Sequence, residues 1–156
     1  RFRLHALYTL YKPLQAVNTI DIHQDWRSKT MNQPKFFATK SGDVLAALIC
    51  GNGSLSCGGQ AMEYLNANTS DGASEKHVPV VEMEGGTLKV SVGSVFHPMT
   101  TEHSIGWVCL VTRRGWQLRA LPVDENPVTE FAVARDDSPI CVYAWCNLHG
   151  LWKTEL

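Results

Sequence analysis

The sequence has no large excess of charge of either sign. Its 14 lysine and arginine residues nearly balance its 15 aspartate and glutamate residues, which gives a formal net charge of −1. Domains that bind nucleic acid are usually strongly basic, so this balance argues against a nucleic-acid partner. The chain also lacks an apolar run close to the roughly 20 residues that a membrane-spanning helix needs. We therefore expect a globular protein with no nucleic-acid partner and no membrane partner.

Cysteine is scarce and irregularly spaced. The chain has five cysteines, at Cys50, Cys57, Cys109, Cys141 and Cys146. An odd number without regular spacing does not indicate a disulfide framework. If Cys146 binds a metal as a thiolate, a reducing compartment suits it best, and we expect a cytoplasmic location.

The first thirty residues differ from the rest. The chain starts with Arg1, and Met31 opens a segment that resembles a normal start. Residues 1–30 carry both acids and bases and lack the apolar core of a signal peptide. We expect an N-terminal extension that is not part of the fold, with His5 and His23 as bystanders.

Three further zones follow. Residues 31–64 are a short stretch with several turn signals, and residues 65–74 are small and polar, which is typical of a linker. Residues 75–156 have a β pattern. There Leu88, Val90 and Val92 alternate with polar residues, as in a strand with one buried face.

The remaining strands are expected at 78–81, 105–111, 116–121, 128–133 and 140–145. Turns every 8–12 residues or so favour an antiparallel β-sandwich over alternating strands and helices. No helix longer than two turns is expected, although the loop around His97 has room for one turn. The fold class predicted for this part is all-β.

Histidine is also scarce, and its distribution is uneven. Four of the six histidines fall in three tight clusters, at 75–77 (Glu-Lys-His), 97–103 (His-Pro-Met-Thr-Thr-Glu-His) and 146–150 (Cys-Asn-Leu-His-Gly). Four neutral imidazoles and one thiolate suit a redox-active first-row metal, iron above all. Catalytic zinc usually has three protein ligands and structural zinc has four, so five candidates argue against zinc.

The three motifs in this order resemble those of superoxide reductase, the family that includes desulfoferrodoxin and neelaredoxin. The resemblance covers roughly residues 75–153, with a weaker similarity back to about residue 35. It implies an immunoglobulin-like β-sandwich that holds one iron ion through four equatorial histidines and one axial cysteine. The implied ligands are His77, His97, His103, His149 and Cys146.

The resemblance also implies a reaction, the one-electron reduction of superoxide to hydrogen peroxide. In the family, the residue matching Glu75 can occupy the open iron position of the oxidised enzyme. The residue matching Lys76 guides the anion and supports proton delivery. The charges agree with this, because ferrous iron with one thiolate keeps a net positive charge and Lys76 adds to the attraction for an anion.

Two-iron members of the family carry an N-terminal rubredoxin-like, or desulforedoxin-like, module with four cysteine ligands. Residues 36–42 resemble its first cysteine pair with Ala38 and Ser41 in place of both cysteines, and residues 57–62 keep only Cys57 of the second pair. We therefore expect a degenerate module over 31–64 that binds no iron. Electrons must then come from an external donor such as rubredoxin. A homo-oligomer, most simply a dimer, is expected because the intact module dimerises in the family.

Two other functions fit part of the pattern. A non-catalytic electron carrier on a cupredoxin-like sandwich uses two histidines and one cysteine, which leaves two histidines unexplained. A sandwich with a purely structural metal has no need of an acid and a base beside its ligands. Metal content, a visible thiolate-to-iron band and the electron stoichiometry separate these alternatives.

Overall fold

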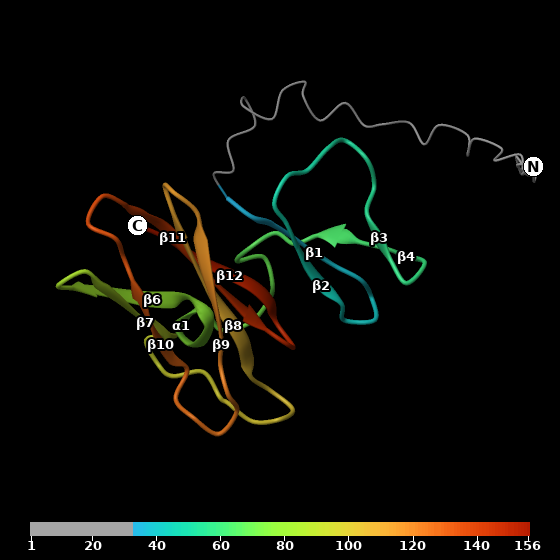
Figure 1. Ribbon diagram of the computed structural model, residues 1–156. Helices are drawn as coiled ribbons and strands as arrows, with labels where there is room; N and C mark the ends of the chain where they lie inside the picture. The colour runs from blue at the N-terminus through green and yellow to red at the C-terminus, as the bar shows by residue number, and fades with distance from the viewer. Residues whose placement is uncertain (1–32) are drawn as a thin grey trace, which may run out of the picture. The chain divides into compact units, whose positions relative to one another are not determined.

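The computed structural model describes residues 33–156. The expected extension over residues 1–30, with His5 and His23, lies outside the described residues. Within the described part nearly all regular structure is β, and the helix there is a single turn (Figure 1). No helix in residues 33–156 is long and apolar enough to cross a membrane.

Two antiparallel sheets make up the larger part of the fold. The three-stranded sheet has the order β10-β7-β6, and the four-stranded sheet has the order β12-β11-β8-β9. The first contains β6 (Pro79–Glu84), β7 (Thr87–Val92) and β10 (Val128–Ala132); the second contains β8 (Ile105–Thr112), β9 (Trp116–Ala120), β11 (Pro139–Cys146) and β12 (Gly150–Glu155). Seven antiparallel strands split three and four are typical of an immunoglobulin-like sandwich. The predicted all-β sandwich is confirmed.

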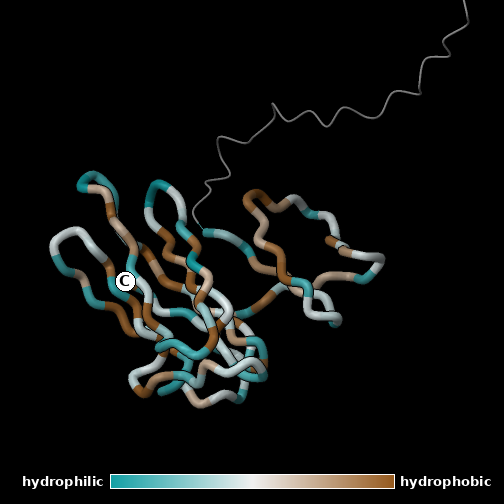
Figure 2. The backbone as a smooth tube through the Cα atoms, turned by 60° about the horizontal axis from the view of Figure 1, so that its bottom comes forward, coloured by the Kyte–Doolittle hydropathy of each residue, from teal (hydrophilic) through white to brown (hydrophobic). Residues whose placement is uncertain are grey.

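The core lies between these sheets because each sheet turns one apolar face inward. In β7 the alternating residues Leu88, Val90 and Val92 are buried, as predicted. Strands β8 and β11 occupy the middle of the larger sheet, and they are apolar along almost their whole length. In Figure 2 hydrophobic colouring recurs along the strands, whereas several of the turns that join them are hydrophilic. A sandwich core of this kind gives the loops at its ends a rigid base.

Two elements were not expected from the sequence. Strand β12 pairs with β11 along its whole length, from Cys146 opposite Gly150 to Cys141 opposite Glu155. The single helical turn is α1 (Ser74–His77), whereas the loop around His97 forms turns without a helix. Strand β12 has only six residues and begins at the last residue of the 146–150 cluster, so its sequence gives little periodic signal. It is recognised as a strand only from its pairing with β11.

A smaller β module precedes the sandwich. Its sheet has the order β2-β1-β5, and a short hairpin joins β3 to β4. The strands are β1 (Lys35–Ala38), β2 (Val44–Ala47), β3 (Ser56–Cys57), β4 (Gln60–Ala61) and β5 (Glu63–Tyr64). Phe36 is 2% exposed, and its ring lies 4.8 Å from Trp107 and 5.3 Å from Tyr143, measured between centroids. A second apolar cluster therefore joins β1 to the outer face of the four-stranded sheet.

The segment 65–74 makes specific contacts along its length. Leu65 and Ala67 pack against the second apolar cluster, and the Leu65 N–H donates to the Phe36 carbonyl oxygen at 2.9 Å. The side chain of Asn68 exchanges two hydrogen bonds with the backbone of Lys153 on β12. The segment thus follows the sandwich closely until α1 begins.

Candidate metal centre

Five side chains that can bind a metal converge at one end of the sandwich. Their potential ligand atoms all lie within 4.8 Å of one another. The five residues are His77, His97, His103, Cys146 and His149. They are the residues that the sequence motifs predict, and the fold brings all of them together.

The short helix α1 positions His77. The Val78 N–H closes the turn on the Ser74 carbonyl oxygen at 2.9 Å, and the His77 side chain is buried. Its ring Nδ1 lies 2.7 Å from the Ala73 carbonyl oxygen. A carbonyl can only accept a hydrogen bond, so Nδ1 carries the proton and Nε2 points into the cluster with a free lone pair.

The loop from β7 to β8 supplies two more histidines. His97 is 2% exposed, and its backbone N–H donates to the Val92 carbonyl oxygen at 3.2 Å. Its ring Nδ1 lies 2.6 Å from the Pro98 carbonyl oxygen, which again leaves Nε2 with a lone pair. His103 is held differently, because its backbone N–H donates to the Thr100 hydroxyl at 3.1 Å and its carbonyl oxygen accepts from the Thr100 N–H at 3.0 Å.

A tight hairpin between β11 and β12 supplies the last two candidate ligands. Cys146 ends β11 and pairs with Gly150, so three residues form the loop and His149 is the last of them. Gly150 has φ of +72°, the left-handed conformation that three-residue hairpins require and that glycine adopts without strain. On its other side β11 pairs with β8, and that pairing shifts register between Trp145 and Cys146. Irregularities of this kind, such as β-bulges, re-aim side chains beside functional sites.

The geometry of the nitrogens and the sulfur calls for a cation. Nε2 of His77 lies 3.1 Å from Nε2 of His97, and each carries a lone pair because each Nδ1 donates to a carbonyl. Two lone pairs at that distance repel one another unless a positive charge lies between them. The same His77 atom is 3.0 Å from Nδ1 of His149. Nε2 of His103 is buried and has no hydrogen-bond partner within residues 33–156, a deficit that a metal would also satisfy.

The sulfur of Cys146 completes the set. It lies 3.4 Å from Nε2 of His97 and 3.6 Å from Nδ1 of His149, and the backbone N–H of His149 points at it from 3.4 Å. Without a metal, burial raises the pKa of this thiol, and the backbone N–H groups of His149 and Leu148 oppose that rise. A bound cation reverses the balance and favours the thiolate.

Burial also favours the neutral form of three of the imidazoles by lowering their pKa values. It lowers the pKa of His97 to about 4, although the hydrogen bond to Pro98 acts in the opposite direction. The pKa values of His77 and His103 are lowered as well, chiefly by burial and further by neighbouring histidines. Neutral imidazole is the form that binds a metal, so these three histidines are in the metal-binding form at neutral pH.

Glu75 and Lys76 lie on α1 directly before His77, and both are exposed. The Lys76 ammonium acts on the cluster electrostatically, since it helps lower the pKa of His103 after the larger effects of burial, His149 and His77. Glu75 has the opposite effect on the pKa of His77, again behind burial. An exposed cation and an exposed anion therefore flank the candidate site.

Several residues around the cluster were not identified from the sequence. The Trp152 ring stacks on the His77 ring, with centroids 4.7 Å apart and planes 21° apart. At Gly72 an added Cβ would meet Trp152, His149 and His77 ring atoms at 3.0 to 3.1 Å. Gly93 has φ of +83°, and a Cβ there would lie 2.6 Å from the Lys76 carbonyl oxygen. Gly93 lies four residues before His97, next to one of the three clusters, whereas Gly72 and Trp152 lie outside those clusters.

The fold and the cluster define a class of protein, a β-sandwich with a candidate mononuclear metal site of four histidines and one cysteine. Comparison with known proteins gives the family. The desulfoferrodoxin family model matches residues 69–155. The chain is 40% identical over 126 residues to desulfoferrodoxin from Clostridium acetobutylicum, a match that covers 80% of this chain and 98% of the relative. It is 41% identical over 114 residues to desulfoferrodoxin from Nitratidesulfovibrio vulgaris, covering 73% and 89% of the two chains.

A solved structure agrees. The superoxide reductase from Treponema pallidum has a TM-score of 0.69 and 44% sequence identity, and the match covers 79% of this chain and 99% of that one. The chain belongs to the desulfoferrodoxin family, which includes superoxide reductases. Family and donor set together support one iron ion as the cofactor, as the sequence predicted.

Proposed function

We propose that this protein is a superoxide reductase. Superoxide takes up one electron and two protons to give hydrogen peroxide, and the proposed iron ligands are His77, His97, His103, His149 and Cys146. The observation that carries the proposal is the convergence of five donors within 4.8 Å, with histidine lone pairs facing one another. Four histidines lie in the cluster, which favours this donor set over the two-histidine site of a copper electron carrier.

When bound, iron supplies the single electron. The protein's own residues do the rest. Carbonyl groups fix the rings of His77 and His97, and the hairpin holds Cys146 with its sulfur toward them. In the proposal the Lys76 ammonium attracts the anionic substrate and supports proton delivery at the exposed side of the site. Glu75, which is exposed on the same turn, is proposed as the carboxylate that would be available as a further ligand to the oxidised iron.

The decisive experiment is a superoxide pulse on anaerobically reduced, iron-loaded protein, followed in the visible range. We expect a new thiolate-to-ferric band with about one iron oxidised per superoxide consumed. The Cys146→Ser variant should lack the band, and the Cys109→Ser variant should keep it because Cys109 is buried in β8. A silent spectrum from iron-loaded protein would rule out the reductase assignment, and a band that survives Cys146→Ser would rule out the sulfur ligand.

A second test addresses Lys76. The Lys76→Ala variant should be oxidised by superoxide more slowly, with a weaker dependence on ionic strength, because a nearby cation speeds the encounter with an anion. Lys89→Ala on β7 removes an equal charge from a strand of the smaller sheet and serves as the control. Equal effects of the two substitutions would show that Lys76 has no special role.

The electron source is proposed to be external. The described part of the module, residues 33–64, has two thiols, Cys50 and Cys57, and a tetrahedral iron–sulfur site needs four. At the turn that resembles the first cysteine pair, the Thr39 hydroxyl and the Ser41 hydroxyl both bond to the Asp43 carboxylate, at 2.8 and 3.0 Å. Polar contacts thus close this turn. A small reductant protein such as rubredoxin is the proposed donor, and a reducing, cytoplasmic setting is proposed with it.

We further propose the division of the chain into an N-terminal extension (1–30), a degenerate module (31–64), a connecting segment (65–74) and the iron-binding sandwich (75–156). The module is the proposed dimer interface. Its exposed apolar side chains include Leu48, Ile49 and Tyr64, and Figure 2 shows hydrophobic colouring on β2 and the loop after it.

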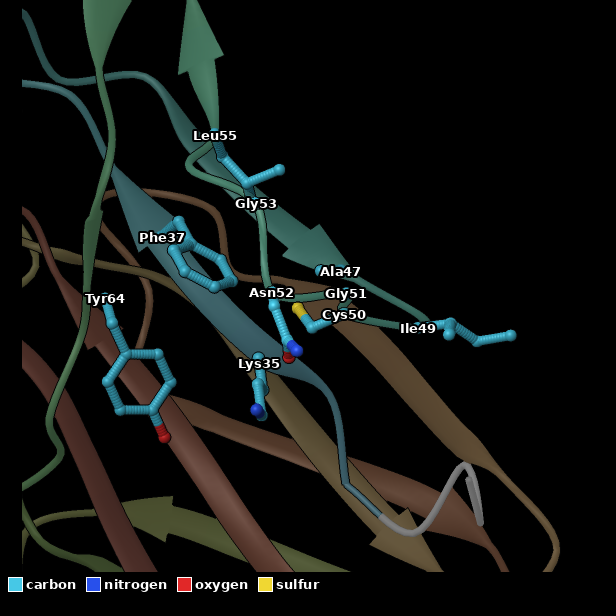
Figure 3. A pocket seen from close by; sticks show the side chains of 10 residues that line it. All are labelled: Lys35, Phe37, Ala47, Ile49, Cys50, Gly51, Asn52, Gly53, Leu55 and Tyr64. Atoms are coloured by element: carbon cyan, nitrogen blue, oxygen red, sulfur yellow. The ribbon is translucent and has the colours of Figure 1, made fainter. Parts of the chain in front are cut away.

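A cavity of about 470 Å³ lies beside these side chains in the module. Figure 3 shows Phe37, Tyr64 and Leu55 lining it, together with Cys50.

The proposed dimer can be tested by sedimentation. We expect a dimer that Leu48→Asp dissociates and that Met83→Asp, on the exposed face of β6, leaves intact. A wild-type monomer at micromolar concentration would refute the dimer.

A further inference from the structure

The side chain of Asn147 links two of the loops that carry candidate ligands. Asn147 opens the hairpin loop between β11 and β12. Its Oδ1 accepts a hydrogen bond from the Ser104 N–H at 3.0 Å, and its Nδ2 donates to the Glu102 carbonyl oxygen at 2.8 Å. Its backbone N–H donates to the Ser104 carbonyl oxygen at 3.2 Å. The two backbone segments that these bonds hold lie on either side of His103.

His103 has particular need of such support. A metal-binding histidine normally donates its second ring N–H to a neighbour, which fixes the ring orientation. The rings of His77 and His97 do so through the Ala73 and Pro98 carbonyl groups. No ring hydrogen bond of His103 is found among residues 33–156, and its buried Nε2 has no partner there. The orientation of this ring therefore depends on its backbone.

We propose that Asn147 is a positioning residue that fixes His103 relative to the hairpin bearing Cys146 and His149. Through its amide, three of the five candidate ligands form one unit, so a displacement of the hairpin carries His103 with it. This inference rests on the proposed ligand set. It predicts that loss of the amide loosens His103 and weakens iron binding, with little effect on the stability of the protein, since Asn147 is exposed.

The chain offers a matched control in Asn68. Its Nδ2 donates to the Lys153 carbonyl oxygen at 3.1 Å, and its Oδ1 accepts from the Lys153 N–H at 2.8 Å. The side chain thus bridges to the backbone of another segment with the same donor and acceptor, but it holds no candidate ligand. Asn68 also has φ of 59°, so Asn68→Ala adds backbone strain and should destabilise the protein at least as much as Asn147→Ala.

The experiment measures ferrous iron affinity by competition with a chelator, on the full chain. Asn147→Ala and Asn68→Ala are each made in the wild-type protein and in His103→Ala. We expect Asn147→Ala to weaken iron binding about 10- to 100-fold in the wild type, as loss of a residue that orients a ligand typically does. In the His103→Ala background it should have an effect within about twofold, because the residue through which it acts is gone. Asn68→Ala should stay within about twofold in both.

Each contrary result has a distinct meaning. If Asn147→Ala weakens binding equally with and without His103, the proposed route through His103 is wrong. If Asn68→Ala weakens binding as much, the effect is one of general stability and the inference fails. If His103→Ala leaves iron affinity unchanged, the proposed ligand set is wrong and the inference falls with it.

A second variant and a second readout guard against misfolding. Asn147→Asp keeps the acceptor for Ser104 but sets a carboxylate oxygen against the Glu102 carbonyl, so it should weaken iron binding at least as much as Asn147→Ala. The ferric electron paramagnetic resonance signal of either variant should broaden into several species as His103 loses its fixed orientation. A single, wild-type signal from both variants would overturn the proposal.

Discussion

Gly72 offers the sharpest test of how the fold packs around the metal centre. A Cβ at this position would lie 3.0 Å from a ring carbon of Trp152 and 3.1 Å from ring carbons of His149 and His77. Such contacts are tight, and all three partners are rigid rings. Two of the three rings belong to candidate ligands, so Gly72→Ala presses on the metal site directly.

The expected cost can be worked from two opposing effects. Overpacking a well-filled site costs about 1–3 kcal/mol. Replacing glycine by alanine returns about 0.4–1 kcal/mol by restricting the unfolded chain. The net loss for Gly72→Ala is therefore about 1–2 kcal/mol. At about 2–4 °C per kcal/mol for a chain of this length, Tm should fall by roughly 2–8 °C. The fall should be larger in the iron-loaded protein, because metal–ligand distances tolerate only about 0.2 Å of change.

The assay is thermal unfolding of iron-free and iron-loaded protein, compared with Gly115→Ala. Gly115 has no atom within 4 Å of an added Cβ, so its substitution should leave Tm unchanged or slightly raised. A Gly72→Ala protein that behaves like Gly115→Ala would show that the rings do not pack against Gly72. A larger loss in the iron-free form than in the loaded form would refute the argument that the metal holds the rings in place.

Three further predictions concern stability. Gly93→Ala combines a positive φ with a clash against the backbone, and it should lower the free energy of unfolding in urea by more than about 2 kcal/mol. Gly85→Ala has a positive φ but open space around the added Cβ, and it should lower that free energy by about 1–2 kcal/mol. Equal losses would show that the clash at Gly93 is relieved. Phe36→Ala leaves a cavity in the apolar cluster between β1 and the sandwich, and it should lower the free energy of unfolding by about 3–5 kcal/mol. The iron spectrum should be retained, because none of the candidate metal ligands belongs to this cluster. Loss of the spectrum would show that the cluster and the metal centre are coupled. In iron-free protein, burial lowers the pKa of His97 to about 4, so the unfolded state binds more protons than the folded state below about pH 6.5. The free energy of unfolding in urea should therefore fall as pH drops from about 6.5 toward 4. A free energy of unfolding that does not change over this pH range would contradict a buried, neutral His97.

The sequence alone determined the candidate ligands and most of the strands. A histidine or cysteine that binds a metal must be present as that residue type, so the motifs around His77, His97 and Cys146 remain visible before folding. Strand β7 was equally clear, since one face of an antiparallel strand meets the core and the other meets solvent. Both signals are local, which is why they can be read along the chain.

The tertiary structure decided how these parts work together. Which nitrogen of His77 and His97 faces the cluster depends on the carbonyl groups of Ala73 and Pro98, which are near in the sequence but which the folded loops turn toward the rings. Gly72 packs against the rings of His149 and Trp152, which are far from it in the sequence. Asn147 hydrogen-bonds the backbone on both sides of His103, which is also distant in the sequence. Strand β12 forms by pairing with β11 across the three-residue hairpin. The turn α1 is also held by a distant residue, because the Val95 N–H donates to the Glu75 carbonyl oxygen at 3.0 Å. The identity of the candidate ligands is thus visible in the sequence, whereas their convergence from separate loops depends on non-local contacts, for which a sequence carries no periodic signal.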